Sequence, residues 1–199
     1  PTLWYQTLRN NLAERNLNWR YNTSVGAGLP INFALADLQN SGDKITRIEG
    51  VFSGTLSWLC SSYDGSVPFS DLVLQAQQMG FTEPDPREDL SGRDMQRKLL
   101  ILARELGLTL ELDDIDLTAL MPEQLAQGDW QSFLDNKQQL DSFIADKATQ
   151  ASEQGKVLRY TGALSLADNK VTAQVGLAFA TQGDALANLT PGDNIFVIN

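Results

Sequence analysis

The residues best suited to chemistry are crowded into one stretch, residues 76–98, which reads AQQMGFTEPDPREDLSGRDMQRK. Pro84 and Pro86 stiffen its first half, because proline fixes φ and disfavours helix for the residue before it. The stretch sets acidic side chains against basic ones, with Glu83, Asp85, Glu88, Asp89 and Asp94 facing Arg87, Arg93, Arg97 and Lys98. Such a rigid acidic loop suits a small polar ligand that carries both an amine and a hydroxyl or carbonyl group.

The second half of this stretch predicts a helix with a lysine on its polar side. Ser91 is expected to cap the helix. Asp94 and Lys98 lie four residues apart, which places them side by side, about 6 Å apart along the axis. By spacing alone, the simpler interpretation is an exposed ion pair that contributes about 0.3–0.5 kcal/mol, beside a solvated acidic turn. An apolar stripe at helical spacing runs along another side, at Met95, Leu99, Leu102 and Leu106.

The absence of histidine from the sequence restricts the chemistry further. It excludes Ser-His-Asp and Cys-His catalysis within this chain, and imidazole metal sites as well. Proton transfer must therefore use carboxylates, lysine or tyrosine. Clustered carboxylates also attract Mg²⁺ or Ca²⁺, but the D-x-D-x-D-G pattern of calcium loops is missing, so a side-chain metal site is not expected.

Bulk properties narrow the choice of partners. The net charge of -10 argues against nucleic acid, because a phosphate backbone would be repelled. No apolar run is long enough to span a membrane, and no signal-peptide pattern opens the chain. The missing initiating Met suggests that the chain is cut from something longer. Cys60 is the single cysteine, which fits a reducing compartment such as the cytoplasm, and it is expected to be a small core residue.

The elements that must position the 76–98 stretch follow from periodicity. A helix directly before it is expected to be capped by Ser70 and stopped by Gly80, with Leu72, Ala76 and Met79 directed inward. Earlier in the chain we predict a helix at 2–16, a strand at 17–25, a helix at 31–38, a strand at 45–52 and a short helix from 53. Later we predict a strand at 109–112, a helix at 130–154, a hairpin of 156–164 and 171–179 around Asp168-Asn169, a short helix at 184–188 and a strand at 195–198.

This mixture of helices and strands lacks strict βαβ alternation. It predicts an α+β fold, with one mixed β-sheet covered by helices on one face. At 199 residues, the chain is long enough for one good core.

The run Gly26-Ala27-Gly28 invites a dinucleotide-binding interpretation. The G-x-G-x-x-G fingerprint needs glycine at position 31, where this chain has Ile31, so a tight strand-to-helix turn is the better default. A turn of this kind leaves backbone carbonyls unpaired. Hard cations such as Na⁺ bind oxygen ligands of that sort, so a cation site formed by the backbone carbonyls of residues 22–29 is physically possible.

Three runs together resemble homoserine dehydrogenase, in the same order and spacing and over essentially all of the chain. They are YNTSVGAGLP, GVFSGTLSWL and GFTEPDPREDLSGRDMQRK. The likeness is strongest to the form fused behind an aspartokinase, of the methionine-branch type, for which SGTLSWL and DGSVPF are the indications. The resemblance implies an oxidoreductase that interconverts L-homoserine and L-aspartate 4-semialdehyde with NADP or NAD.

The resemblance also implies roles for individual residues. Glu83 and Asp94 would hold the substrate, with Asp89 supporting them, and Lys98 would exchange the proton at the reacting oxygen. Gly80 would lie against the nicotinamide end of the cofactor. A sodium ion would bind the backbone oxygens of four residues, Asn22, Val25, Ala27 and Leu29. Asn22 replaces a more usual acidic residue, a change that a main-chain ligand tolerates.

The sequence departs from the family in one important way. The family places a dinucleotide-binding fold before this region and completes it afterwards, and it has a second lysine just upstream of residue 1. None of these is present. We therefore expect residues 1–199 to be a substrate-binding and dimerisation domain, inactive alone, in which the helix at 1–16 and the strand at 195–199 lead to the absent domain.

A homodimer through the sheets is expected by the same resemblance, and exposed strand edges would favour it. Two other interpretations remain open. One is a non-catalytic amino-acid-binding or assembly module with a decayed acidic loop. The other, which the sequence supports least, is a divalent-metal hydrolase that uses the carboxylate cluster.

Overall fold

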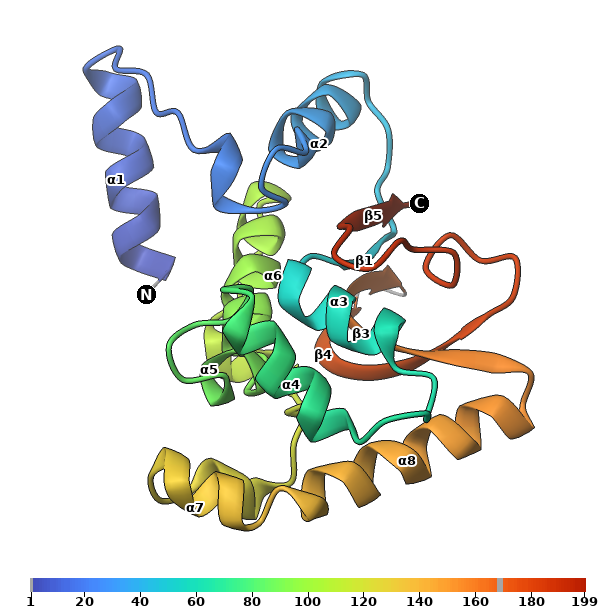
Figure 1. The fold of residues 1–199 in the computed structure, drawn as a ribbon. Coiled ribbons are helices and arrows are strands. Elements are labelled where there is room, and N and C mark those ends of the chain that lie inside the picture. Colours follow the sequence, from blue (N-terminus) through green and yellow to red (C-terminus); the bar gives the residue numbers. More distant parts are fainter. Residues whose placement is uncertain (1, 168–169) are drawn as a thin grey trace.

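The computed structural model describes residues 2–167 and 170–199 as a mixed sheet with helices packed over it (Figure 1). The first part contains α1 (Thr2–Glu14), η1 (Asn22–Ser24), α2 (Ile31–Asn40), β1 (Arg47–Val51), α3 (Gly54–Ser62) and α4 (Phe69–Gln78). The middle part contains α5 (Arg87–Leu90), α6 (Arg93–Glu105), η2 (Leu112–Asp114), β2 (Asp116–Leu117) and η3 (Glu123–Ala126). The last part contains α7 (Trp130–Asp135), α8 (Gln138–Glu153), β3 (Lys156–Ala167), β4 (Lys170–Thr181) and β5 (Ile195–Ile198).

The five strands described form one sheet in the order β2-β4-β3-β1-β5. The sheet is mixed, because β2 runs parallel to β4 while the other pairs are antiparallel. Helices α3, α6 and α8 pack against β3, and α4 lies over α3 and α8 (Figure 1). The expected α+β class, with helices over one face of a mixed sheet, is confirmed. The tip of the expected hairpin, Asp168-Asn169, lies outside the described residues.

The core forms where the helices meet β3. Alternate residues of this strand, among them Leu158, Tyr160 and Leu164, face the helices and are buried. From α6, Met95, Leu99 and Leu102 are fully buried against them, as their four-and-three spacing predicted. Burying one such side chain contributes about 1.5–3 kcal/mol, so this stripe fixes α6 on the sheet. None of the helices in the described ranges is long and apolar enough to cross a membrane.

Three predictions about helices are wrong in detail. Ser70 does not cap α4, since Pro68 holds the capping position. The N–H and the hydroxyl of Ser70 instead donate to Asp141 of α8 at 2.7 and 3.0 Å. Met79 does not face inward but is 48% exposed. The single helix expected at 130–154 is two helices, α7 and α8, because the chain leaves helical geometry at Asn136.

Three further predictions of local structure are wrong. The segments 17–25 and 109–112 form no strand, and 184–188 forms turns rather than a helix. Alternating side chains suit a strand only where a neighbouring strand supplies hydrogen bonds. In the 17–25 segment the aromatic residues instead pack on one another, with the rings of Trp19 and Tyr21 4.8 Å apart.

The face of the sheet opposite the helices is only partly covered. The loop at 182–194 lies over one end of it, where Leu186 packs against Val51 and Ala180. Arg159 ties this loop down, because its buried guanidinium donates to the carbonyls of Leu186, Leu158 and Ala187 at 2.7–2.9 Å. Burial lowers the pKa of Arg159. Beyond the loop, the same face carries small and polar residues, at Glu49, Thr161, Ala163, Ser165, Gln174 and Gly176.

Candidate active site

The acidic loop (residues 80–92), which the two prolines predict to be stiff, contains a helical turn that the sequence did not predict. Pro86 starts the short helix α5. The Nε and Nη2 atoms of Arg87 donate hydrogen bonds to the Asp85 carboxylate, the shorter of which is 2.6 Å. The Nη1 atom of Arg87 donates to the carbonyl of Gly128 at 3.0 Å. This guanidinium lowers the pKa of the Asp85 carboxyl. The loop is thereby fixed to the segment before α7.

Gly92, rather than the expected Ser91, occupies the position before α6. Its φ of +72° lies in the left-handed region that favours glycine. A Cβ atom there would overlap the hydroxyl of Tyr160, which is held in place by donating to the Thr118 carbonyl at 2.6 Å. Ser91 still contributes, since its hydroxyl accepts from the Arg93 N–H at 3.3 Å. The close packing of glycine on tyrosine thus sets the direction in which α6 begins.

The structure brings three of the predicted substrate residues to one cavity. Glu83 and Asp89 from the acidic loop, and Asp94 from the first turn of α6, line a space of about 210 Å³. The remaining lining residues are Ser53, Leu56, Glu88, Arg93, Met95 and Arg97. The cavity therefore combines carboxylates with two guanidinium groups in a volume suited to a small amino acid.

Lys98 does not line this cavity itself, but it forms an ion pair with Asp94, which does. Its Nζ lies 2.8 Å from Asp94 Oδ2, and it also donates to the carbonyl of Phe52 at 3.0 Å. The lysine side chain is 23% exposed, whereas that of Asp94 is 60% exposed. The ion pair expected from spacing exists, but it is more than a surface pair, because the carbonyl that follows β1 holds the ammonium from a second direction.

Asp89 supports the cavity from within the acidic loop. Its Oδ2 accepts the backbone N–H of Glu83 at 2.9 Å, which orients the residue that carries the Glu83 carboxylate. Burial raises the pKa of Asp89, while the hydrogen bond from the Glu83 N–H partly offsets that rise. The Thr55 hydroxyl donates to the Phe81 carbonyl at 2.6 Å.

The raised pKa of Asp89 predicts a pH dependence of stability. A folded-state pKa above the unfolded value of about 3.9 means that the folded chain binds the proton more tightly. The resulting stabilisation is complete below the unfolded pKa and is lost as pH rises through the folded one. As pH rises from about 3 to about 6, the free energy of unfolding of Asp89→Asn, measured in urea, should therefore increase relative to that of the wild type, with a linkage of at most one proton. The exposed Asp37→Asn variant serves as the control, and parallel curves for Asp89→Asn and wild type would contradict the prediction.

Sequence reasoning missed Thr55 and the Phe52 carbonyl. Phe52 lies in the turn between β1 and α3, and Thr55 lies in the first turn of α3, which Ser53 caps by accepting the Leu56 N–H at 3.3 Å. The S-G-T run after a buried strand was a usable signal for Thr55, because polar residues at such a turn often face a site. Nothing local in the sequence indicated the Phe52 carbonyl.

Gly80 lies at the edge of a second, more apolar cavity. It follows α4 with φ of +73°, and no atom lies within 4 Å of the position that a Cβ would take. Its neighbours Met79 and Phe81 are about half exposed and line a space of about 530 Å³ with Trp58, Gly54, Thr55, Pro191 and Gly192. Open space at a glycine beside exposed apolar side chains fits the approach of a flat ring such as a nicotinamide.

The loop around residues 22–29 is a tight turn, as expected. Gly26 and Ala27 both have positive φ, and the Leu29 N–H donates back to the Gly26 carbonyl at 2.9 Å. The Leu29 carbonyl itself accepts the Ile31 N–H at 2.9 Å, which leaves one lone pair for another partner. Beside the loop, Asn32 Oδ1 is buried and has no hydrogen-bond partner among the described residues. Oxygen donors of this kind fit a hard cation such as Na⁺.

Comparison with known proteins identifies the family. The model of the homoserine dehydrogenase family matches residues 30–199, and the chain belongs to that family. The chain is 45% identical over 194 residues to the bifunctional aspartokinase/homoserine dehydrogenase 2 of Escherichia coli (strain K12), covering 98% of this chain and 24% of that protein. It is 42% identical over 187 residues to the homoserine dehydrogenase of Emericella nidulans, covering 88% and 50%. The resemblance to the aspartokinase-fused form is confirmed, and the chain spans a quarter to a half of these relatives.

Solved structures share the fold. A Candida auris protein of unknown function superposes with a TM-score of 0.81 at 36% identity, covering 89% of this chain and 51% of that one. A homoserine dehydrogenase from Thiobacillus denitrificans superposes with a TM-score of 0.71 at 23% identity, covering 89% and 37%. At 23% identity, the likeness to the Thiobacillus denitrificans structure concerns the fold alone.

Proposed function

We propose that this chain is the substrate-binding and dimerisation domain of an enzyme that interconverts L-homoserine and L-aspartate 4-semialdehyde with NAD(P). The observation that carries the proposal is the position of Lys98, held by Asp94 and the Phe52 carbonyl beside a cavity lined by carboxylates. Membership of the homoserine dehydrogenase family supports the same reaction. The single, buried Cys60 fits a reducing compartment such as the cytoplasm.

The cavity residues have separate roles in the proposed reaction. Glu83 and Asp94 bind the substrate, with the Glu83 carboxylate as the partner of its ammonium group. Of the three donors on the Lys98 ammonium, two go to Asp94 and to Phe52, so the third can point to the substrate oxygen. Lys98 gives its proton to the developing alkoxide when the aldehyde is reduced, and it takes the hydroxyl proton in the reverse direction.

NAD(P), when bound, supplies or accepts the hydride at the carbon that bears this oxygen. Gly80 and its apolar neighbours receive the nicotinamide end, while α1 and β5 lead to a nucleotide-binding part outside this chain. The backbone oxygens of Asn22, Val25, Ala27 and Leu29 hold a sodium ion. The 199-residue chain alone should therefore show no NADP⁺-dependent oxidation of homoserine in a spectrophotometric assay. A rate near that of the whole enzyme would refute this division.

The homodimer forms through the uncovered face of the sheet. This face carries small side chains, such as those of Ala163 and Ser165, so a second copy can approach it closely. Arginine at position 163, in the middle of the face, would hold the two sheets apart. We expect the wild-type chain to sediment as a dimer at micromolar concentration and Ala163→Arg to sediment as a monomer. Gln150→Arg, on the exposed side of α8, should remain a dimer, and a monomeric wild type would contradict the proposal.

A further inference from the structure

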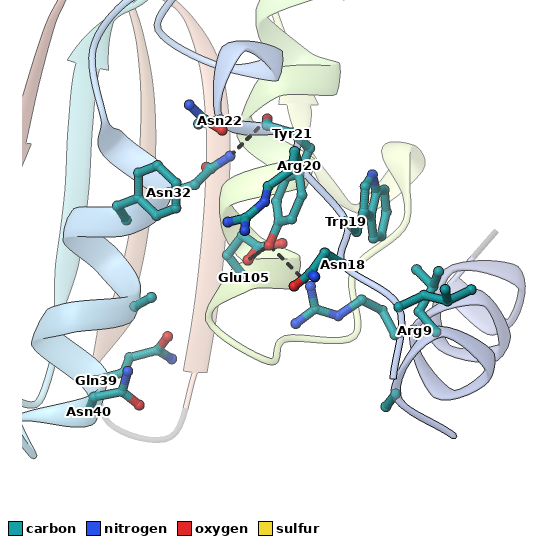
Figure 2. A pocket seen from close by; sticks show the side chains of 15 residues that line it. Arg9, Asn18, Trp19, Arg20, Tyr21, Asn22, Asn32, Gln39, Asn40 and Glu105 are labelled. Atoms are coloured by element: carbon teal, nitrogen blue, oxygen red, sulfur yellow. Dashed lines mark hydrogen bonds between the residues drawn. The ribbon is translucent and has the colours of Figure 1, made fainter. Parts of the chain in front are cut away.

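Glu105, the last residue of α6, joins three separate parts of the chain. Its Oε1 accepts the hydroxyl of Tyr5 from α1 at 2.8 Å, and its Oε2 accepts the hydroxyl of Tyr21, which precedes η1, at 2.6 Å. Figure 2 shows the Tyr21 side chain directed at Glu105. One carboxylate thus ties α1 and the start of the 22–29 loop to α6.

Other contacts reinforce this arrangement, which we call the Glu105 clamp (Tyr5, Arg9, Trp19, Tyr21 and Glu105). Arg9 donates to the Tyr21 hydroxyl at 3.1 Å, and the Trp19 ring lies 6.1 Å from that of Tyr5. Burial and the Glu105 carboxylate raise the pKa of Tyr5 to about 12, and they also raise the pKa of Tyr21. Both phenols therefore remain protonated donors at neutral pH.

Helix stability does not explain an acidic residue at this place. A negative charge in the last turn of a helix opposes the helix dipole, at a cost of roughly 0.3–1 kcal/mol. At Glu105 two short hydrogen bonds offset that cost, and each is of the stronger charge-assisted kind. The carboxylate therefore stabilises the junction between α1 and α6 rather than the end of α6.

The clamp matters because α1 has little else to hold it. In Figure 1 α1 stands apart from the other helices, and its Leu3 and Trp4 side chains are 76% and 70% exposed. A polar cavity of about 470 Å³ lies between α1 and α2, with Asn18, Asn32 and Gln39 among its lining residues (Figure 2). Loss of the Glu105 bonds would free α1 to tilt.

We propose that Glu105 is a positioning residue that fixes α1, and whatever precedes it, relative to the helix that carries Lys98. This inference rests on the proposed function, in which α1 leads to the part that binds the cofactor. Glu105 and Lys98 are seven residues apart on α6, so they share a face about 10 Å apart along the axis. A tilt of α1 would shift the nicotinamide relative to the substrate carbon beside Lys98, and a misplacement of about 1 Å can cost about 10²-fold in rate.

The test uses the whole enzyme that contains this chain. Glu105→Ala should lower kcat by about 10- to 100-fold, while KM for homoserine stays within about twofold because the cavity at Glu83 and Asp94 is untouched. Glu105→Gln, which keeps one acceptor, should fall between Glu105→Ala and wild type. The double variant Tyr5→Phe/Tyr21→Phe should reproduce most of the loss without changing any charge. Glu14→Gln, on the exposed side of α1, should match wild type.

Two results would overturn the inference. One is a wild-type kcat in folded Glu105→Ala. The other is failure of Glu105→Ala to fold while the double tyrosine variant keeps full kcat. If the wild-type enzyme itself does not oxidise homoserine, the proposed function fails instead. In that case the emission of Trp19 still tests the clamp in a 199-residue chain whose other tryptophans, Trp4, Trp58 and Trp130, are replaced by phenylalanine. Glu105→Ala should shift this emission to the red, and an unchanged spectrum would contradict the clamp.

Discussion

Replacing Lys98 with alanine is expected to lower kcat of the whole enzyme by about 10²–10⁴-fold and to leave the proposed homodimer intact. The loss follows from removing the one ammonium group that is held at the cavity by both Asp94 and the Phe52 carbonyl. The dimer survives because the lysine lies on the helical side of the sheet, away from the uncovered face. Initial rates with homoserine and NADP⁺, together with sedimentation, measure both effects.

Two further variants separate the contribution of the Lys98 ammonium charge from that of its packed aliphatic stem. Lys98→Met keeps most of the apolar stem and should lose as much activity as Lys98→Ala. Lys44→Ala, at an exposed position before β1, should retain wild-type kcat. Should Lys98→Ala keep full activity, the catalytic role fails and a non-catalytic binding or assembly module becomes the better interpretation.

Gly92→Ala is expected to lower the free energy of unfolding by about 2–5 kcal/mol. An alanine there keeps a left-handed backbone at a cost of about 1–2 kcal/mol, and its Cβ overlaps the fixed Tyr160 hydroxyl, which adds about 1–3 kcal/mol of overpacking. Because Gly92 sets the start of α6, activity should fall as well. Urea denaturation of the 199-residue chain measures the first effect.

Gly107 provides a matched control at the other end of α6. Its φ is +78°, but no atom lies within 4 Å of a Cβ placed there. Gly107→Ala should therefore show the backbone cost alone, about 1–2 kcal/mol. Adding Tyr160→Phe to Gly92→Ala should recover part of the packing cost. Equal losses at the two glycines would show that Tyr160 does not set the start of α6.

Local periodicity predicted the elements whose hydrophobic pattern lies within the segment itself. The stripe of α6 and the alternation at 171–179 in β4 were found because each segment buries one side against the core. The strand expected at 17–25 was wrong because alternation does not reveal whether a neighbouring strand exists. The cap was misplaced for a similar reason, since the preference for Gly92 comes from Tyr160, which lies far away in the sequence.

The candidate site was predictable only in part. Spacing gave the Asp94–Lys98 pair, and the family resemblance gave the roles of Glu83 and Asp89, which the structure places at the same cavity without testing those roles. The bonds of Lys98 to Phe52 and of Glu105 to Tyr5 could not be predicted. Each joins residues distant in the sequence, and their geometry depends on how α6 packs against the sheet and α1.

The most direct measurement is a crystal structure of the whole enzyme with L-homoserine bound. We predict that the substrate hydroxyl will lie within hydrogen-bond distance of Lys98 Nζ, about 3 Å, with the substrate ammonium at the Glu83 carboxylate. A homoserine molecule bound elsewhere, or one whose hydroxyl lies beyond the reach of Lys98, would contradict the proposed role of this cavity.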